Sequence, residues 1–338
     1  QWDAHYGKAT AKEVQITHPG PLTYYGQIRP LLEHRCVNCH GCYDAPCQLK
    51  LEAFEGLLRG ANTQPVYNGA RLLAAEPSRL FEDAQTTAQW RNKGFYPVFN
   101  ERSAAGKNNL QLSLLAQTLV QKKNHPLPVQ ELLPAGFSIG VDAKHECPRI
   151  ETYPLFTAVN PLAGMPYGLP GLKPVEAKKI LDWVALGAPM GTPPPTAPKT
   201  DQQIEQWEAF LNGPSLKTQL AARYLYEHLF LAHLYFPDIN QEHFRLVRSK
   251  TPPGQPIEII SSRRPYDDPK VERVYYRLKL DRSSLLMKTY MPYALGKERL
   301  EQWRQWFLNP NFTVDHLPSY DPVQSANPFL TFAQLPAE

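Results

Sequence analysis

The chain has 338 residues, which is enough for two domains that each bury a core. Its net charge of +4 is mild and its lysines and arginines form no clustered stripe, so we expect no nucleic-acid partner. No uninterrupted apolar stretch is long enough to cross a bilayer, so we expect no membrane span. Proline, at 34 residues, is about twice as frequent as in average proteins and predicts many rigid turns and long ordered coil.

A short helix is predicted within residues 24–35. Ile28, Leu31 and Leu32 recur there at close to helical spacing. Pro30 fits only the first turn of a helix or a kink. The helix is therefore short, and it leads directly into the cysteine motif that follows.

That motif is Cys36-Val37-Asn38-Cys39-His40, a C-x-x-C-H sequence. Two thiols three positions apart can add to the two vinyl groups of a haem, while the adjacent imidazole takes one axial position on the iron. The alternatives are a redox-active C-x-x-C pair or half of a zinc site, but no convincing second Cys/His pair at zinc-ligand spacing follows. We predict one haem c, bound covalently through Cys36 and Cys39, with His40 as an iron ligand.

Three cysteines remain outside the motif: Cys42, Cys47 and Cys147. Covalent haem attachment belongs to the bacterial periplasm or an equivalent compartment, so we expect an exported chain whose signal peptide has been removed. In an oxidising compartment two of the three thiols should form a disulfide and one should remain unpaired. All three pairings are open, and the favoured one joins Cys42 to Cys47 across the turn at 43–46.

A methionine on a rigid loop is the leading candidate for the second axial ligand. Met165 lies in the Pro/Gly-rich segment 164–172, and such a loop can hold a neutral sulfur against iron at little entropic cost. The alternative is a methionine that fills a gap in the core. We predict that His40 and Met165 together coordinate the haem iron.

The following segment predicts the closing helix of a cytochrome domain. In residues 173–189, Pro174 suits a first helical position, an apolar stripe follows, and Gly187 with Pro189 marks the end. We therefore expect a mainly α, cytochrome c-like domain over residues 1–190. It carries a long coil-rich insertion at about 41–163, with a helix predicted at 110–122.

Residues 191–200 contain four prolines and predict a semi-rigid linker. A smaller α+β domain should then occupy 201–338. Thr200 and Gln203 form a plausible capping box for a helix that stops at Asn212. The further elements that we expect are helices at 220–236 and 298–308 and strands at 244–248, 257–261 and 274–280. His228 and His233 lie about 140° apart on the first of these helices, so we do not expect them to share a metal ion.

The segment 35–51 resembles the haem-binding region of the bacterial periplasmic fatty acid cis/trans isomerases. The run Gly41-Cys42-Tyr43-Asp44-Ala45-Pro46-Cys47 carries the likeness more specifically than the haem motif does, because many unrelated cytochromes share that motif. The resemblance extends through the Met165 region into the second domain. Family members are considerably longer than this chain, so the resemblance implies an N-terminal portion, with a second domain that continues beyond residue 338.

The resemblance implies conversion of cis double bonds in phospholipid acyl chains to trans, with no nicotinamide cofactor and no net redox change. The partners would be the acyl chains and, through peripheral contact, a membrane surface. His40 and Met165 would act in catalysis through the haem iron. One route is electron withdrawal from the alkene by ferric haem, and another is reversible addition of a thiyl radical from an unpaired cysteine.

Two apolar, proline-bounded segments, 95–99 and 234–237, could dip into a lipid interface, although burial in the core is the favoured interpretation. The rival function is a periplasmic electron-transfer c-type cytochrome with an accessory binding domain. It explains Cys36, Cys39, His40 and Met165 equally well. Only the run from Gly41 to Cys47 and the large insertion favour the isomerase.

Overall fold

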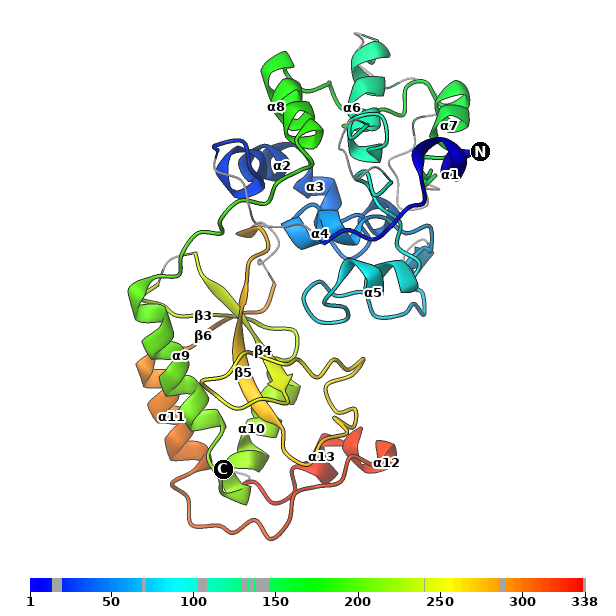
Figure 1. The fold of residues 1–338 in the computed structure, drawn as a ribbon. Helices are drawn as coiled ribbons and strands as arrows, with labels where there is room; N and C mark the ends of the chain where they lie inside the picture. Colours follow the sequence, from blue (N-terminus) through cyan, green and yellow to red (C-terminus); the bar gives the residue numbers. More distant parts are fainter. Residues whose placement is uncertain are drawn as a thin grey trace. The chain divides into compact units, whose positions relative to one another are not determined.

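The computed structural model describes residues 1–13, 20–68, 71–102, 108–128, 133, 137, 146–239, 241–285 and 290–336 (Figure 1). The chain divides into two compact units, Gln1–Pro194 and Pro195–Glu338. The boundary between them falls within the predicted proline-rich linker. Among the described residues, no helix has the length and apolar character needed to cross a membrane.

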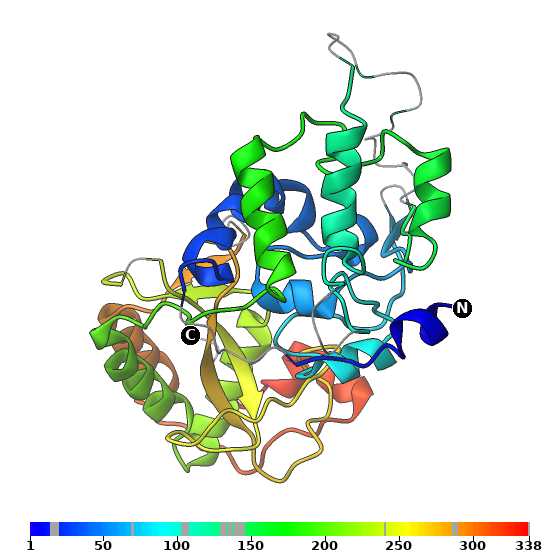
Figure 2. The same ribbon diagram turned by 45° about the horizontal axis from the view of Figure 1, so that its top comes forward.

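The first unit is built mainly of short helices joined by long ordered coil. Its helices are α1 (Trp2–Tyr6), α2 (Arg29–Arg35), α3 (Val37–His40), α4 (Phe54–Arg59), α5 (Thr87–Asn92), α6 (Leu114–Asn124), α7 (Tyr153–Val159) and α8 (Pro174–Ala185). A π-helical turn (Tyr24–Ile28), a 3-10 turn (Pro46–Gln48) and a small hairpin of β1 (Tyr67–Asn68) and β2 (Arg71–Leu72) complete it. In both views α8, α6 and α7 lie side by side (Figures 1 and 2).

The segment before the cysteine motif is two consecutive pieces rather than one helix. The π-helical turn begins where Thr23 Oγ1 accepts from the Gly26 amide at 3.0 Å, and α2 then carries Pro30 in its first turn, where the missing N–H removes no bond. The predicted helix at 110–122 begins later, at Leu114, because Ser113 caps it by accepting from the Ala116 amide.

The π-helical turn and α8 are held against each other by buried groups. The Tyr24 amide donates to the Pro189 carbonyl at 2.9 Å, and the indole of Trp183 donates to the same oxygen at 2.9 Å. Trp183 and Ile28 are fully buried. The closing helix that the sequence predicts thus packs against the segment that leads into the cysteine motif.

The second unit places helices around a four-stranded mixed sheet. The sheet has the order β5-β4-β3-β6, from β3 (His233–Tyr235), β4 (His243–Ser249), β5 (Tyr275–Asp281) and β6 (Pro292–Ala294). Only β3 and β6 pair in parallel; in the longest pairing, Leu246 of β4 lies opposite Leu278 of β5. The helices are α9 (Pro198–Leu211), α10 (Leu216–Leu229), α11 (Lys297–Phe307), α12 (Pro322–Ser325) and α13 (Pro328–Thr331).

The core of this unit is aromatic and joins the helices to the sheet. Trp207 of α9 and Trp303 of α11 meet edge to face with ring centroids 5.4 Å apart, and these helices lie side by side in both views (Figures 1 and 2). Phe236 and Phe244 are fully buried beside them in the same cluster. Burial of such large side chains is the main favourable term for folding this unit.

Three sequence expectations for the second unit are wrong. The helix α9 starts at Pro198, because proline suits the first helical position, and the Thr200 hydroxyl donates to the Glu242 carboxylate instead of capping. The helix predicted at 220–236 ends at Leu229, and residues 233–235 form β3 because two neighbouring strands supply backbone partners. The strand expected at 257–261 reduces to one bridge, between Ser249 and Ile259.

Candidate functional site

The two thiols of the C-x-x-C-H motif lie on one helical turn. The amides of Cys39 and His40 both donate to the Cys36 carbonyl, at 3.2 and 2.9 Å, which closes the turn that includes α3. Residues three apart on a helix share a face, so both sulfur atoms can reach one flat group. Neither thiol is in a disulfide. Burial, with Cys39 as a smaller cause, raises the pKa of the Cys36 thiol to about 12.

The His40 imidazole is buried and oriented by a backbone carbonyl. Its Nδ1 lies 2.9 Å from the carbonyl oxygen of Leu49, and the Leu51 amide donates back to the His40 carbonyl at 2.7 Å. A carbonyl oxygen only accepts hydrogen bonds, so Nδ1 must carry the proton. In that tautomer Nε2 holds the lone pair, which is how a metal-binding histidine is usually prepared.

Met165 is half-buried on a loop that α6 holds in place. Its amide donates to the Thr118 carbonyl at 3.0 Å, and the Gln121 side chain donates to the Asn160 and Pro161 carbonyls at 2.7 and 3.1 Å. The loop is thus fixed on both sides of the turn that leads to the methionine. The structure brings Cys36, Cys39 and His40 into one turn, whereas Met165 lies in a separate loop of the same unit.

The loop approaches α6 so closely that only glycine fits beside Met165. A Cβ on Gly164 would lie 2.3 Å from the backbone nitrogen of Lys122, which no side chain can accept. Sequence reasoning identified the loop from its prolines and glycines but did not find Lys122 or the Leu49 carbonyl. A carbonyl carries no sequence signal, and a lysine is ordinarily an exposed residue.

The favoured disulfide pairing is wrong, because Cys47 pairs with Cys147 rather than with Cys42. Their Cα atoms lie 5.5 Å apart, and the Tyr96 hydroxyl donates to the Cys147 carbonyl at 3.1 Å, which helps to fix that residue beside Cys47. The Cys42 thiol instead donates to Asp44 Oδ1 at 2.8 Å. Cys42 is therefore the unpaired thiol of the three. Partial burial and this hydrogen bond raise its pKa to about 11.

The two histidines once expected on one helix lie on different elements. His228 is in α10, where its Nδ1 contacts the Tyr224 carbonyl at 2.7 Å, and His233 is in β3, where its Nδ1 contacts the Tyr290 carbonyl at 3.0 Å. In the part of the chain that the structure describes, no group of three or more His, Cys, Asp or Glu side chains could hold a metal ion. The alternative of half a zinc site therefore gains no further ligands of these types.

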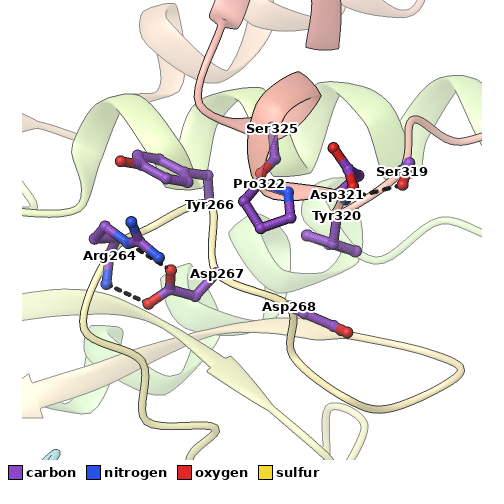
Figure 3. A pocket seen from close by; sticks show the side chains of 9 residues that line it. All are labelled: Arg264, Tyr266, Asp267, Asp268, Ser319, Tyr320, Asp321, Pro322 and Ser325. Atoms are coloured by element: carbon purple, nitrogen blue, oxygen red, sulfur yellow. Dashed lines mark hydrogen bonds and ion pairs between the residues drawn. The ribbon is translucent and has the colours of Figure 1, made fainter.

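A polar cleft of about 500 Å³ lies in the second unit, between the segments 264–268 and 319–325 (Figure 3). Arg264 and Asp267 pair across its edge at 2.7 Å. Burial alone would raise the pKa of Asp267, but the hydrogen bonds from Arg264 outweigh it and lower the pKa. None of the predicted haem ligands lines this cleft.

A model of one protein family matches most of the chain. The model describes fatty acid cis/trans isomerases, and the match covers residues 75–338. The chain belongs to this family. It is therefore an isomerase that acts on the double bonds of fatty acid chains, as the resemblance of segment 35–51 implied, and the electron-transfer alternative is not favoured. No curated protein and no solved structure matches the chain.

The matched region divides the candidate site. Met165, its clamp on α6 and the whole second unit lie inside the match, whereas Cys36, Cys39 and His40 precede residue 75. Membership in the family and the C-x-x-C-H motif are thus independent observations on different parts of the chain.

Proposed function

We propose that this isomerase converts cis to trans double bonds in the acyl chains of membrane phospholipids, using a haem c attached through Cys36 and Cys39. His40 and Met165 are the residues that would bind its iron. The observation that carries the proposal is the contact between His40 Nδ1 and the Leu49 carbonyl, because it fixes the tautomer that presents Nε2 to a metal. His228 and His233 make the same kind of contact, so it is the position of His40, directly after Cys36 and Cys39, that relates this tautomer to a haem.

The remaining donors fit the same group. Both motif thiols are unpaired and share one helical turn, and the Met165 loop is clamped by Thr118 and Gln121. A c-type haem needs two thiols that add to its vinyl groups, and an imidazole and a thioether that bind its iron. When bound, the haem would supply an iron that can draw electron density from an alkene and so lower the barrier to rotation about its double bond.

The residues of the chain orient the two side chains that would bind the haem iron. The Leu49 carbonyl holds the His40 ring, and the Thr118 carbonyl holds the backbone of Met165. We propose that His40 and Met165 would hold the haem iron, and that the Met165 side chain would be the one to make room for the double bond.

The fold of the first unit is compatible with a cytochrome c-like arrangement. The helix before the motif is joined to the closing helix by Arg35 and Glu176, and α6 packs beside α8. We therefore propose a cytochrome c-like domain in residues 1–190, with the insertion at about 41–163 tied back to the haem turn by the Cys47–Cys147 disulfide. Covalent haem attachment and this disulfide both favour the periplasm as the location.

Contact with a membrane surface is proposed through α12 and α13. The segments 95–99 and 234–237 supply core residues, with Val98 and Phe236 almost fully buried. By contrast, Val323, Phe329 and Leu330 are 81%, 87% and 59% exposed, and no charged residue occurs from 322 to 337. Three such side chains cover at most roughly 500 Å², which is short of the about 800 Å² per partner of a stable protein interface. A lipid interface accepts so small an apolar surface.

The test is isomerisation by haem-loaded protein. The protein is incubated with vesicles of a cis-unsaturated phosphatidylethanolamine, and the acyl isomers are separated by gas chromatography. We expect trans product from the loaded chain and none from a Cys36→Ala/Cys39→Ala variant that cannot attach haem. Undiminished product from that variant would refute the role of the haem while leaving the isomerase activity in place.

A further inference from the structure

A buried lysine with no anionic partner among the described residues lies beside the Met165 loop. Lys122, near the end of α6, is 2% exposed, and its Nζ has no hydrogen-bond partner among the residues that the structure describes. Burial lowers the pKa of its amine. A cation removed from water without an anionic partner is strongly unfavourable, so a natural protein that keeps one there usually has a use for it.

The Met165 loop is folded around this side chain. Gly164 packs on the Lys122 backbone, where a Cβ would lie 2.3 Å from the lysine nitrogen and 2.9 Å from its Cβ. Farther along the loop, a Cβ on Gly171 would lie 3.3 Å from Lys122 Cγ. The two glycines thus let one loop follow Lys122 from its backbone nitrogen to its Cγ atom. The loop that carries the candidate iron ligand therefore packs along the stem of the buried lysine.

We propose that Lys122 is the ionic partner of a haem propionate. The inference rests on the proposed function, since it assumes that haem occupies this unit. The proposed function brings two groups to the first unit, the haem and the acyl chain of the phospholipid. The haem carries carboxylates, whereas the acyl chain carries none. An ammonium in a dry environment pairs strongly with a carboxylate, and this pairing offsets part of the cost of burying both charges. Lys122 would then help to lock the Met165 loop onto the bound haem.

The pairing predicts that one substitution changes stability in opposite directions with and without haem. Lys122→Met keeps the length of the side chain and removes the charge. In a Cys36→Ala/Cys39→Ala background, which holds no covalent haem, we expect this change to raise the melting temperature, because an unpaired buried cation is lost. In the haem-loaded chain we expect it to lower the melting temperature, because a propionate loses its partner.

Two further variants make the result specific. Lys123→Met alters the exposed neighbour on the same helix and should shift neither melting temperature by a comparable amount. Lys122→Arg keeps the charge and should retain most of the stability of the loaded form. The haem midpoint potential gives a second readout: loss of a cation beside the haem should lower it for Lys122→Met and leave it nearly unchanged for Lys123→Met.

The outcomes separate this inference from the function on which it rests. If no haem attaches to the wild-type chain, as judged by intact mass and Soret absorbance, both fail. If haem attaches and Lys122→Met shifts the two melting temperatures in the same direction, with an unchanged potential, the pairing is wrong while the haem assignment stands. Opposite shifts together with a lowered potential support it.

Discussion

The guanidinium of Arg35 binds the carboxylate of Glu176 across 141 positions of sequence, with Nη2 at 2.9 and 3.1 Å from its two oxygens. Arg35 ends α2, directly before the cysteine motif, and Glu176 lies in the first turn of α8. The hydrogen bond from Arg35, followed by the one from the Lys173 amide, lowers the pKa of Glu176 below its ordinary 4.5. This contact ties the closing helix to the cysteine motif.

The pH dependence of this contact follows from the direction of that shift. A carboxyl group whose pKa is lowered in the folded chain stabilises it above the ordinary value, and the contribution is lost as pH falls through the lowered pKa. We expect Glu176→Gln to reduce stability near neutral pH. Below about pH 4.5 the stability of the variant should fall less steeply with pH than that of the wild-type chain. Thermal melts at several acidic pH values would measure this; a variant curve parallel to the wild-type curve would contradict it.

A buried ion pair in the second unit should be costly to break from one side. Arg277 Nε lies 2.7 Å from Glu208 Oε2, and the Leu278 amide donates to Glu208 Oε1 at 2.9 Å. Glu208→Leu leaves the arginine without its carboxylate, and we expect a loss of about 3–5 kcal/mol in the free energy of unfolding. Denaturant unfolding followed by tryptophan fluorescence measures it. The double variant with Arg277→Leu should recover part of the loss, and full additivity would show that the pair is not coupled.

Gly164 and Gly171 offer a matched test of the Met165 loop. Gly164→Ala forces a Cβ against the backbone of α6, whereas Gly171→Ala meets only a flexible lysine stem at 3.3 Å. We expect the first change to displace Met165 and abolish the weak Met-to-iron absorption band of the ferric haem, and the second to preserve it. Loss of that band in both variants, or in neither, would mean that the close approach at Gly164 does not position the ligand.

The free thiol distinguishes the two chemical routes. Cys42 is the unpaired cysteine outside the haem motif, and its thiol is hydrogen-bonded to Asp44. We expect Cys42→Ser to retain isomerisation of phospholipid vesicles, because the proposed route acts through the iron. Loss of activity with intact haem absorbance would instead favour the thiyl radical. Cys47→Ser is no substitute for this variant, because it also opens the disulfide.

The disulfide itself should stabilise the first unit substantially. It joins residues 100 positions apart, and the loop-entropy account gives about 4–5 kcal/mol for a loop of that length. We expect Cys147→Ser to lower the melting temperature of the first unit while leaving the α9–α11 core of the second unchanged. Peptide mass mapping without reductant checks the pairing directly, and a Cys42–Cys47 peptide in the wild-type chain would contradict it.

Membrane contact can be tested by replacing exposed apolar residues with serine on two different surfaces. Val323, Phe329 and Leu330 changed to Ser should abolish flotation of the chain with phospholipid vesicles. Leu155 and Val159 of α7, which are 74% and 78% exposed, changed to Ser provide the control and should leave flotation intact. Retained flotation of the triple variant would remove α12 and α13 as the contact surface. A change in oligomeric state instead would assign them to self-association.

Sequence patterns correctly predicted the elements that are determined by residues close to them in sequence. The apolar stripe and Gly187 correctly located α8, and the stripe of Leu300, Trp303 and Phe307 located α11. By contrast, residues 233–235 form a strand because β4, which follows closely in sequence, and β6, from a distant part of the chain, supply backbone partners. An apolar run of this kind reads equally well as helix when those partners are unknown.

The same distinction holds in the candidate site. The C-x-x-C-H spacing is itself a local signal, so the sequence alone predicts Cys36, Cys39 and His40 as candidate site residues, and that stays a prediction. The partner of Cys47 lies 100 positions away, and the nearest cysteine in sequence was the wrong choice. Lys122 could not have been identified at all, since only the fold places Gly164 and Gly171 around it.

The position of Cys147 also sets an order of events for biosynthesis. When the chain is made from its N-terminus, Cys36, Cys39, Cys42 and Cys47 all emerge before the residue with which Cys47 pairs. In the proposed periplasmic location, four neighbouring thiols would meet an oxidant during that interval, and a bond among them would occupy a sulfur needed for the disulfide or for the proposed haem. Production of this protein should therefore depend on a thiol reductant or a haem-attachment apparatus that acts before the last cysteine appears.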